Sequence, residues 1–368
     1  MNKKFDHFKI PSEKQIKKLW ENCIFVFDTN ILINLYRYSD KTKKDLLKIL
    51  NNIKTRIWIP YQVGYEYYNN RIGIIEIELT QFDNFIGKLG EFKPLLNIVK
   101  KEINKKSSNP HLNSKFIEDI ESIVNKEKEN IREKKEKYSD LLKNDTIERE
   151  IAILFENNVG EQFNNEKLEE IYKEGELRFK NGIPPGFEDS KSKTGIRIYG
   201  DLIIWFEMIK KSSELKKSII FITDDLKNDW WKTYKNKKLN SPRPELIIEF
   251  DQKCNQKFYM YDSYQFMYLS QKYLKQKVDP NSIEEAKETR DENYLLKKIF
   301  SFYSTNNLNF DLKSKIVDVT KTPVSDSTSP KIELKSIDDT WNDFLNVKIN
   351  DLKKDSNSNE LEDTSEDM

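Results

Sequence analysis

Acidic side chains follow two apolar runs that the sequence predicts as buried strands. The run IFVF ends in DTN, which begins at Asp28, and the run SIIFI ends in TDD, which begins at Thr223. Because the carboxyl ends of parallel strands and the amino ends of the adjoining helices share one edge of a sheet, side chains from these places are expected to meet. The predicted cluster consists of Asp28, Glu66 (about one helical turn after another strand), Asp201 (at the start of DLIIWFEMIKK), Asp224 and Asp225.

Crowded carboxylates repel one another and hold protons more tightly unless a cation neutralises them. Oxygen ligands on an open edge suit Mg²⁺ or Mn²⁺, which keep several waters and accept substrate phosphate as a further ligand. Such a site can activate water for attack on a phosphodiester. Each residue also has a structural alternative, since Asp28, Asp224 and Asp225 suit turns and Asp201 suits a helix amino end. Their joint placement favours the metal site.

Composition excludes several other kinds of chemistry. His7 and His111 are the only histidines in 368 residues, so catalysis by paired histidines, or by a Ser-His or Cys-His couple, is not expected. The ten glycines form no Gly-x-Gly or phosphate-loop motif. Cys23 and Cys254 are too few for a disulfide framework or a zinc cluster.

The charge and the apolar runs indicate where the protein works. The net charge is +1, so any basic surface must be local. The first residues lack the apolar core of a signal peptide, and no run approaches the roughly 20 apolar residues of a membrane span. A cytoplasmic location without a membrane partner is therefore expected.

Short apolar runs alternate with amphipathic helical segments and predict an α/β domain with a parallel sheet. Strands are predicted at residues 24–27, 56–60, 218–222 and 257–261. Leu46, Leu47, Leu50 and Ile53 recur at helical spacing. Ser12 and Gln15 are spaced as a capping box before another helix.

The expected domain covers residues 1–275 and contains a long helical insertion at about 71–182. The insertion is rich in charge, and its apolar seam of Ile147, Ile151, Leu154 and Phe155 must be buried against something, with the sheet domain favoured. A helical extension is expected at 276–317. Residues 318–368 read as a largely flexible polar region with a short helix near 341–349.

Several segments together resemble the PIN-like nuclease superfamily: FVFDTNILINLY, IPYQVGYEYYNNR, IPPGFEDSKS with IYGDLIIWFEMI, IIFITDDLKNDWW, and RPELIIEF with FYMY. They lie within residues 20–275, and the nearest group is the large bacterial PIN-like branch with a helical insertion. The resemblance implies a three-layer α/β/α fold with a central parallel sheet. It also implies metal-dependent hydrolysis of a phosphodiester by a metal-activated water, most often in RNA.

When the site residues of the family are transferred to matching positions of this sequence, the resemblance implies that Asn30 orients Asp28 and its metal water. It also implies that Thr223 supplies a hydroxyl at the strand end. The metal-binding and catalytic set would be Asp28, Glu66, Asp201 and Asp225, with Mg²⁺ or Mn²⁺ as cofactor. Asp224 is an additional candidate ligand whose role is open. Glu76 and Glu78 are alternatives to Glu66, and a turn in the PPGFED loop is favoured over a site role for Glu188 or Asp189.

Basic and aromatic residues near the predicted edge are candidates for gripping a nucleic acid, RNA in preference to single-stranded DNA. They are Lys191, Lys193, Arg197, Lys227 and Trp230. Solvated lysines and a tryptophan buried in the core are the structural alternatives, and core packing is favoured for Trp231.

Two other functions compete with the nuclease. A haloacid-dehalogenase-type phosphatase usually needs a second Asp two positions after the first, where this chain has Asn30. A catalytically weak binding or scaffold module would not need the full acidic set. The resemblance further implies a toxin or a phage-defence effector, restrained or activated by a protein partner. The insertion also offers a surface for self-association.

Overall fold

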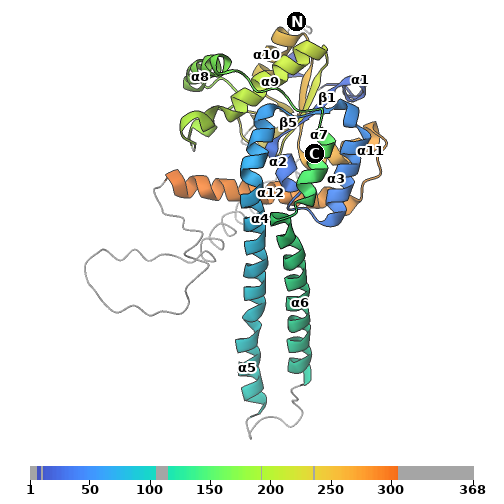
Figure 1. Cartoon of the computed structure of the whole chain (residues 1–368), viewed down its shortest axis with the longest axis vertical. Helices are drawn as coiled ribbons and strands as arrows, with labels where there is room; N and C mark the ends of the chain where they lie inside the picture. The colour runs from blue at the N-terminus through green and yellow to red at the C-terminus, as the bar shows by residue number, and fades with distance from the viewer. Residues whose placement is uncertain (1–5, 10, 105–114, 192, 235–236, 306–368) are drawn as a thin grey trace, which may run out of the picture. The chain divides into compact units, whose positions relative to one another are not determined.

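Four parallel strands form the central sheet, in the order β2-β1-β3-β6 (Figure 1). The register places Val26 of β1 between Trp58 of β2 and Phe221 of β3. All residues of these strands are buried, because helices cover both faces of the sheet, and the strands are therefore continuously apolar. The strands are β1 (Ile24–Phe27), β2 (Ile57–Trp58), β3 (Ile219–Ile222) and β6 (Phe258–Tyr261). The predicted parallel sheet is confirmed.

The computed structural model describes residues 6–9, 11–104, 115–191, 193–234 and 237–305. The predicted flexible region 318–368, its short helix near 341–349 and His111 lie outside these described residues. Strand β2 is shorter than the predicted 56–60, because Arg56 ends a 3₁₀ turn and Pro60 caps the next helix.

Helices pack in two groups. Helix α11 packs with α1, α3 and α12. Helix α9 packs with α4 (Tyr61–Gly90), α8 (Asn165–Lys180) and α10, so the sheet lies between two helical layers. Ser12 and Gln15 form the predicted capping box of α1. None of the helices in the described part of the chain has the length and apolar character of a membrane span. Their bounds are α1 (Glu13–Asn22), α2 (Thr29–Asn34), α3 (Asp40–Asn52), α9 (Gly200–Leu215), α10 (Pro244–Cys254), α11 (Ser263–Tyr273) and α12 (Pro280–Thr305).

A long antiparallel helical hairpin follows β2 (Figure 1). It consists of α4 (Tyr61–Gly90), α5 (Phe92–Ile103) and α6 (Lys115–Ser139). Helix α4 has 30 residues, which is about 45 Å of helix. Lys135 of α6 pairs with Asp83 of α4, and the rings of Tyr138 and Phe82 lie 5.7 Å apart, which fixes the antiparallel pairing. Because α4 is continuous, it carries both Glu66 and the hairpin, and the expected insertion boundary at residue 71 falls inside it.

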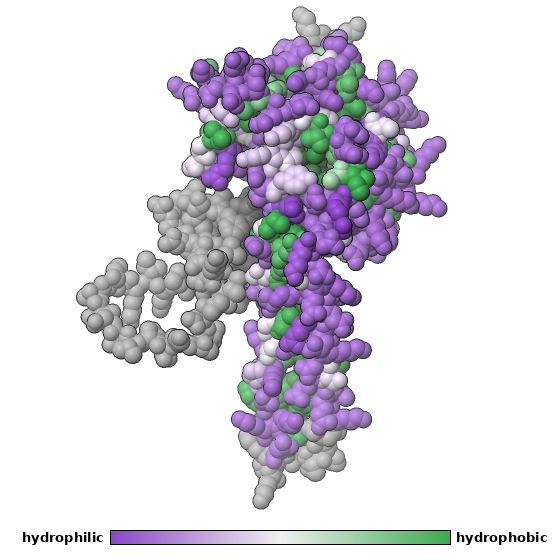
Figure 2. Space-filling view, viewed as in Figure 1, coloured by the Kyte–Doolittle hydropathy of each residue, from purple (hydrophilic) through white to green (hydrophobic). Residues whose placement is uncertain are grey.

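The outer part of the hairpin exposes apolar side chains among its charges (Figure 2). Phe85, Phe92 and Val99 recur every seven residues, and Leu95 lies on the same face. These four residues, here called the hairpin seam, are between 40% and 60% exposed. A heptad seam of this kind is typical of helices that pack against other helices.

The segments after the hairpin return to the sheet. Helix α7 (Thr146–Phe155) buries Ile147, Ile151, Leu154 and Phe155, and Phe155 packs against Phe27 of β1 at 6.3 Å between rings. The seam predicted for this segment therefore packs on the sheet domain. Helix α8 (Asn165–Lys180) follows. An antiparallel pair that the sequence did not predict, β4 (Trp231–Tyr234) and β5 (Lys237–Pro242), precedes α10.

Candidate active site

Asp28 is held at the end of β1 by three hydrogen-bond donors. Its Oδ1 accepts from the backbone N of Thr29 at 2.7 Å, so Asp28 caps α2. Its Oδ2 accepts from Asn30 Nδ2 at 2.5 Å and from Thr223 Oγ1 at 2.6 Å. Asn30 Oδ1 in turn accepts from the backbone N of Asp224 at 2.9 Å. The DTN and TDD sequences therefore join the ends of β1 and β3, which pair directly in the sheet.

Glu66 lies beside this network, one turn into α4. Its Oε2 accepts from Thr29 Oγ1 at 3.0 Å, and its Oε1 accepts from Gln62 Nε2 at 2.8 Å. A Cβ at Gly200 would lie 2.8 Å from Oε1, so Glu66 contacts the start of α9, next to Asp201. Only a residue without a side chain leaves Glu66 this position.

The two alternatives to Glu66 lie farther along α4. Glu78 pairs with Arg37 at 3.2 Å, and Glu76 is exposed. Glu66 is the glutamate that contacts the ends of β1 and α9.

The Lys227 ammonium joins three carboxylates at the same edge. Its Nζ lies 2.8 Å from Asp225 Oδ2, 3.2 Å from Asp201 Oδ2 and 2.5 Å from Asp189 Oδ1. The Lys227 side chain is 24% exposed, and that of Asp189 is 1% exposed. Lys193 also pairs with Asp189, at 2.5 Å. A positive charge thus lies among the carboxylates, where a metal ion would be expected.

The pKa values of Asp28 and Glu66 are raised mainly by burial and further by repulsion from neighbouring carboxylates. Burial raises the pKa of Asp28 to about 7, with further raising by Asp201, Glu66 and Asp225, although the hydrogen bond from Thr223 lowers it. Burial, together with Asp201, also raises the pKa of Glu66. These pairwise effects indicate that the four carboxylates share one electrostatic environment.

Burial has the opposite effect on the pKa of the Lys227 ammonium. It lowers the pKa of Lys227, but Asp201, Asp225 and Asp189 outweigh it and raise the pKa well above its ordinary value. Lys227 is therefore charged and compensates the acidic cluster.

Asp224, which was predicted as an additional metal ligand, lies in a different environment from the other four carboxylates. Its Oδ2 accepts from Asn34 Nδ2 and its Oδ1 from the backbone N of Ser263, both at 2.8 Å. Burial raises its pKa to about 6, and the charges that act on it are Asp262 and Arg290. Asp224 thus joins β3 to the start of α11, and its neighbour Asp225 faces Lys227.

The residues predicted to grip nucleic acid separate into two sets. Lys191 and Arg197 are exposed at the edge, although Lys191 pairs with Glu188 at 2.8 Å. Trp230, which was predicted to stack on a base, is 2% exposed, and its Nε1 donates to Asp201 Oδ2 at 3.2 Å.

Lys193 forms an ion pair with Asp189, and Lys227 forms ion pairs with Asp189, Asp201 and Asp225. Trp231 is buried as expected, at 1% exposure.

Sequence reasoning missed two further acidic groups. Asp189 was assigned to a turn, yet it is buried against Lys227 and Lys193. Asp229 is fully buried, and its Oδ2 accepts from the backbone N of Gly186 and of Glu188 at 3.0 Å each. It thereby fixes the PPGFED loop next to Asp201. The closeness of Asp229 to TDD in the sequence was a usable signal for this role.

The donor set suits a divalent cation in chemistry, since Asp28, Glu66, Asp201 and Asp225 supply only carboxylate oxygens. Within the described ranges, however, no three acidic, histidine or cysteine groups converge as a bound metal would require. The contacts of Lys227 with Asp201 and Asp225 give the physical reason, because the ammonium lies between them and must move before both carboxylates can reach one ion.

Comparison with known families agrees with this architecture. The sequence model described as PIN like domain matches residues 24–246, a span that includes β1, β3 and the carboxylates Asp28, Glu66, Asp201 and Asp225. The chain therefore belongs to the PIN-like domain family, whose fold is of the nuclease type and whose members are generally nucleases. No curated protein and no solved structure matches the chain.

Proposed function

We propose that the protein is a metal-dependent endoribonuclease. The observation that carries the proposal is that Asp201, Glu66 and Asp225 all raise the pKa of Asp28 at one end of a parallel sheet, in a chain of the PIN-like family. Structural carboxylates are ordinarily paired or exposed, whereas Asp28 is half-buried and close to other acids. Perturbed ionisation in such a cluster is typical of functional sites.

Each residue has a distinct role in the proposal. Asp28, Asp201 and Asp225 would hold Mg²⁺ or Mn²⁺, with Glu66 completing the set. A bound cation of this kind supplies Lewis acidity and lowers the pKa of its water. Asn30 and Thr223 position the Asp28 carboxylate. When no cation is bound, Lys227 neutralises Asp201 and Asp225.

The choice of RNA over DNA rests on the family resemblance, because phosphate contacts do not distinguish the two. Lys191 and Arg197 are exposed and suit phosphate contacts with either nucleic acid, which would make binding depend on salt.

The decisive experiment compares the wild type with Asp28→Asn on end-labelled RNA and single-stranded DNA. Asp28→Asn removes a negative charge that the site needs for the cation, so cleavage should fall at least about a hundredfold. Asp251→Asn is the matched control, because Asp251 is 48% exposed and forms a surface ion pair with Lys257. Cleavage that persists in excess EDTA, or in Asp28→Asn, contradicts the proposal.

A binding or scaffold module is the second candidate, and Lys227 is the observation that favours it. A lysine that neutralises the acidic cluster permanently would leave no place for a cation. Wild-type protein that binds RNA but cleaves none with Mg²⁺ or Mn²⁺ would support this alternative.

We further propose a role as a toxin or phage-defence effector under the control of a protein partner, on the family resemblance alone. Expression of wild type, but not of Asp28→Asn, should slow growth and create new cellular RNA ends. Equal growth and identical RNA ends would contradict this role.

A further inference from the structure

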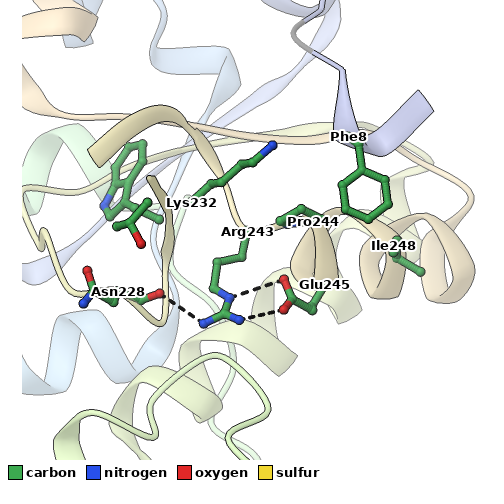
Figure 3. A pocket seen from close by; sticks show the side chains of 9 residues that line it. Phe8, Asn228, Lys232, Arg243, Pro244, Glu245 and Ile248 are labelled. Atoms are coloured by element: carbon green, nitrogen blue, oxygen red, sulfur yellow. Dashed lines mark hydrogen bonds and ion pairs between the residues drawn. The ribbon is translucent and has the colours of Figure 1, made fainter. Parts of the chain in front are cut away.

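A pocket of about 350 Å³ is lined in part by the segment that follows Asp225 (Figure 3). Three segments line it: the 3₁₀ helix η1 (Asp6–Phe8), the stretch from Asn228 into β4, and the start of α10. Figure 3 shows Phe8 on one side of the pocket and Arg243 on another. None of these lining residues belongs to the proposed catalytic set.

The lining combines aromatic surface with positive charge. Phe8 is 53% exposed, and Lys232 Nζ lies 6.0 Å from the centre of its ring. Arg243 is held by both oxygens of Glu245, at 2.6 and 3.3 Å, and its Nη1 donates to the carbonyl of Asn228 at 3.3 Å. The Phe8 ring also lies 4.5 Å from that of His7. Exposed aromatic rings beside a cation are a combination with which proteins bind single-stranded nucleic acid, with the base stacked and the phosphate near the charge.

The pocket shares a loop with the carboxylates. Asn228 follows Asp225 by three residues, so their Cα atoms are at most about 11 Å apart. Trp231, a wall of the pocket, donates from Nε1 to the carbonyl of Asp225 at 2.6 Å. The backbone N of Arg243 donates to the carbonyl of Trp230, whose ring contacts Asp201. A strand bound at the cluster would reach the pocket within a few nucleotides.

We propose that this pocket is a nucleotide subsite for single-stranded RNA, with a base on Phe8 and the adjoining phosphate at Lys232. The inference rests on the proposed function for the identity of the ligand. The pocket would help to fix the position of the bound RNA strand relative to the carboxylates.

The test measures binding of a labelled single-stranded RNA by fluorescence anisotropy, in full-length Asp28→Asn protein so that the RNA is not cut. Phe8→Ala and Lys232→Ala are each expected to weaken binding about tenfold. Lys210→Ala is the matched control and should leave binding unchanged, because Lys210 also lies over a ring, that of Phe163 at 5.6 Å, but on α9 away from the pocket. Thermal melts check that each variant is folded.

The outcomes separate the subsite from the nuclease proposal. Unchanged affinity in both pocket variants overturns the subsite, as does the absence of any RNA binding. If adenosine monophosphate binds in a Phe8-dependent way while RNA binding is independent of Phe8, the pocket takes a free nucleotide and the RNA assignment is overturned. If the wild type cleaves no RNA but Phe8→Ala still weakens binding, the nuclease proposal fails and the subsite stands.

Discussion

Replacing Lys227 with methionine should make the metal-free protein less stable and its affinity for a divalent cation higher. Methionine keeps most of the volume and removes the ammonium that contacts Asp189, Asp201 and Asp225 at 2.5 to 3.2 Å. Without that charge, three close carboxylates repel one another or take up protons. A cation would then enter without displacing a lysine.

The size of the effect follows from burial. Removing one partner of a buried ion pair costs about 3–5 kcal/mol, and the lower end applies here because the Lys227 side chain is 24% exposed. Lys193→Met is the matched control. Lys193 is 43% exposed and pairs with Asp189, so solvent screening reduces its expected cost to about 1 kcal/mol or less.

Urea unfolding followed by tryptophan fluorescence gives the free energies of unfolding, first in EDTA and then with Mn²⁺. Electron paramagnetic resonance of free Mn²⁺ gives the affinities. We expect Mn²⁺ to stabilise Lys227→Met more than the wild type, by about 2.7 kcal/mol for a hundredfold gain in affinity. Equal stability of Lys227→Met and wild type in EDTA, or equal Mn²⁺ affinity, would refute the view that Lys227 compensates the cluster.

Other consequences of the geometry are also measurable. Because the pKa of Asp28 is raised from 3.8 to about 7, its contribution to metal-free stability is full below pH 3.8 and is lost as pH rises to about 7. A cation must displace this proton, so Mn²⁺ affinity in titrations should fall about tenfold per pH unit below 7, and an affinity independent of pH in this range would contradict the raised pKa. Gly200→Ala would put a Cβ 2.8 Å from Glu66 Oε1 and should slow RNA cleavage tenfold or more with little change in melting temperature. Replacing residues 97–142 with a short linker should broaden the range of RNAs cleaved while Mn²⁺ affinity stays unchanged; unchanged selectivity would contradict a gating role. If the hairpin seam joins two copies, Leu95→Glu should convert a dimer to a monomer in sedimentation equilibrium, and a monomeric wild type would refute that association.

Much of the fold could be predicted because its signals are local. The four parallel strands are short apolar runs, and the residues that end them are read directly from the sequence. The rule that strand ends share an edge then placed Asp28 and Asp225 together. The pair β4 and β5 was missed because its sequence, WKTYKNKKLNSP, has neither a sustained apolar alternation nor the Asn-Gly or Asp-Gly pair that marks a hairpin turn.

Other features depended on contacts between distant segments. Successive side chains of an extended chain point in opposite directions, so one of Asp224 and Asp225 had to face away from the cluster. The sequence does not say which, whereas the packing of α11 against β3 gives Asp224 the backbone N of Ser263. Trp230 is buried for a similar reason, since the core packs Phe221 against its ring at 5.2 Å.

The sequence by itself determined the class of site: carboxylates at the ends of parallel strands, with an amide and a hydroxyl to orient them. Only the tertiary structure decided the charge balance within that site. The PPGFED loop brings Asp189 to Lys227 across a separation of 38 residues, and the same lysine reaches Asp201 and Asp225. Local patterns specify which residues end a strand, but ion pairing depends on three-dimensional distance, which is fixed only when the loop packs against the sheet.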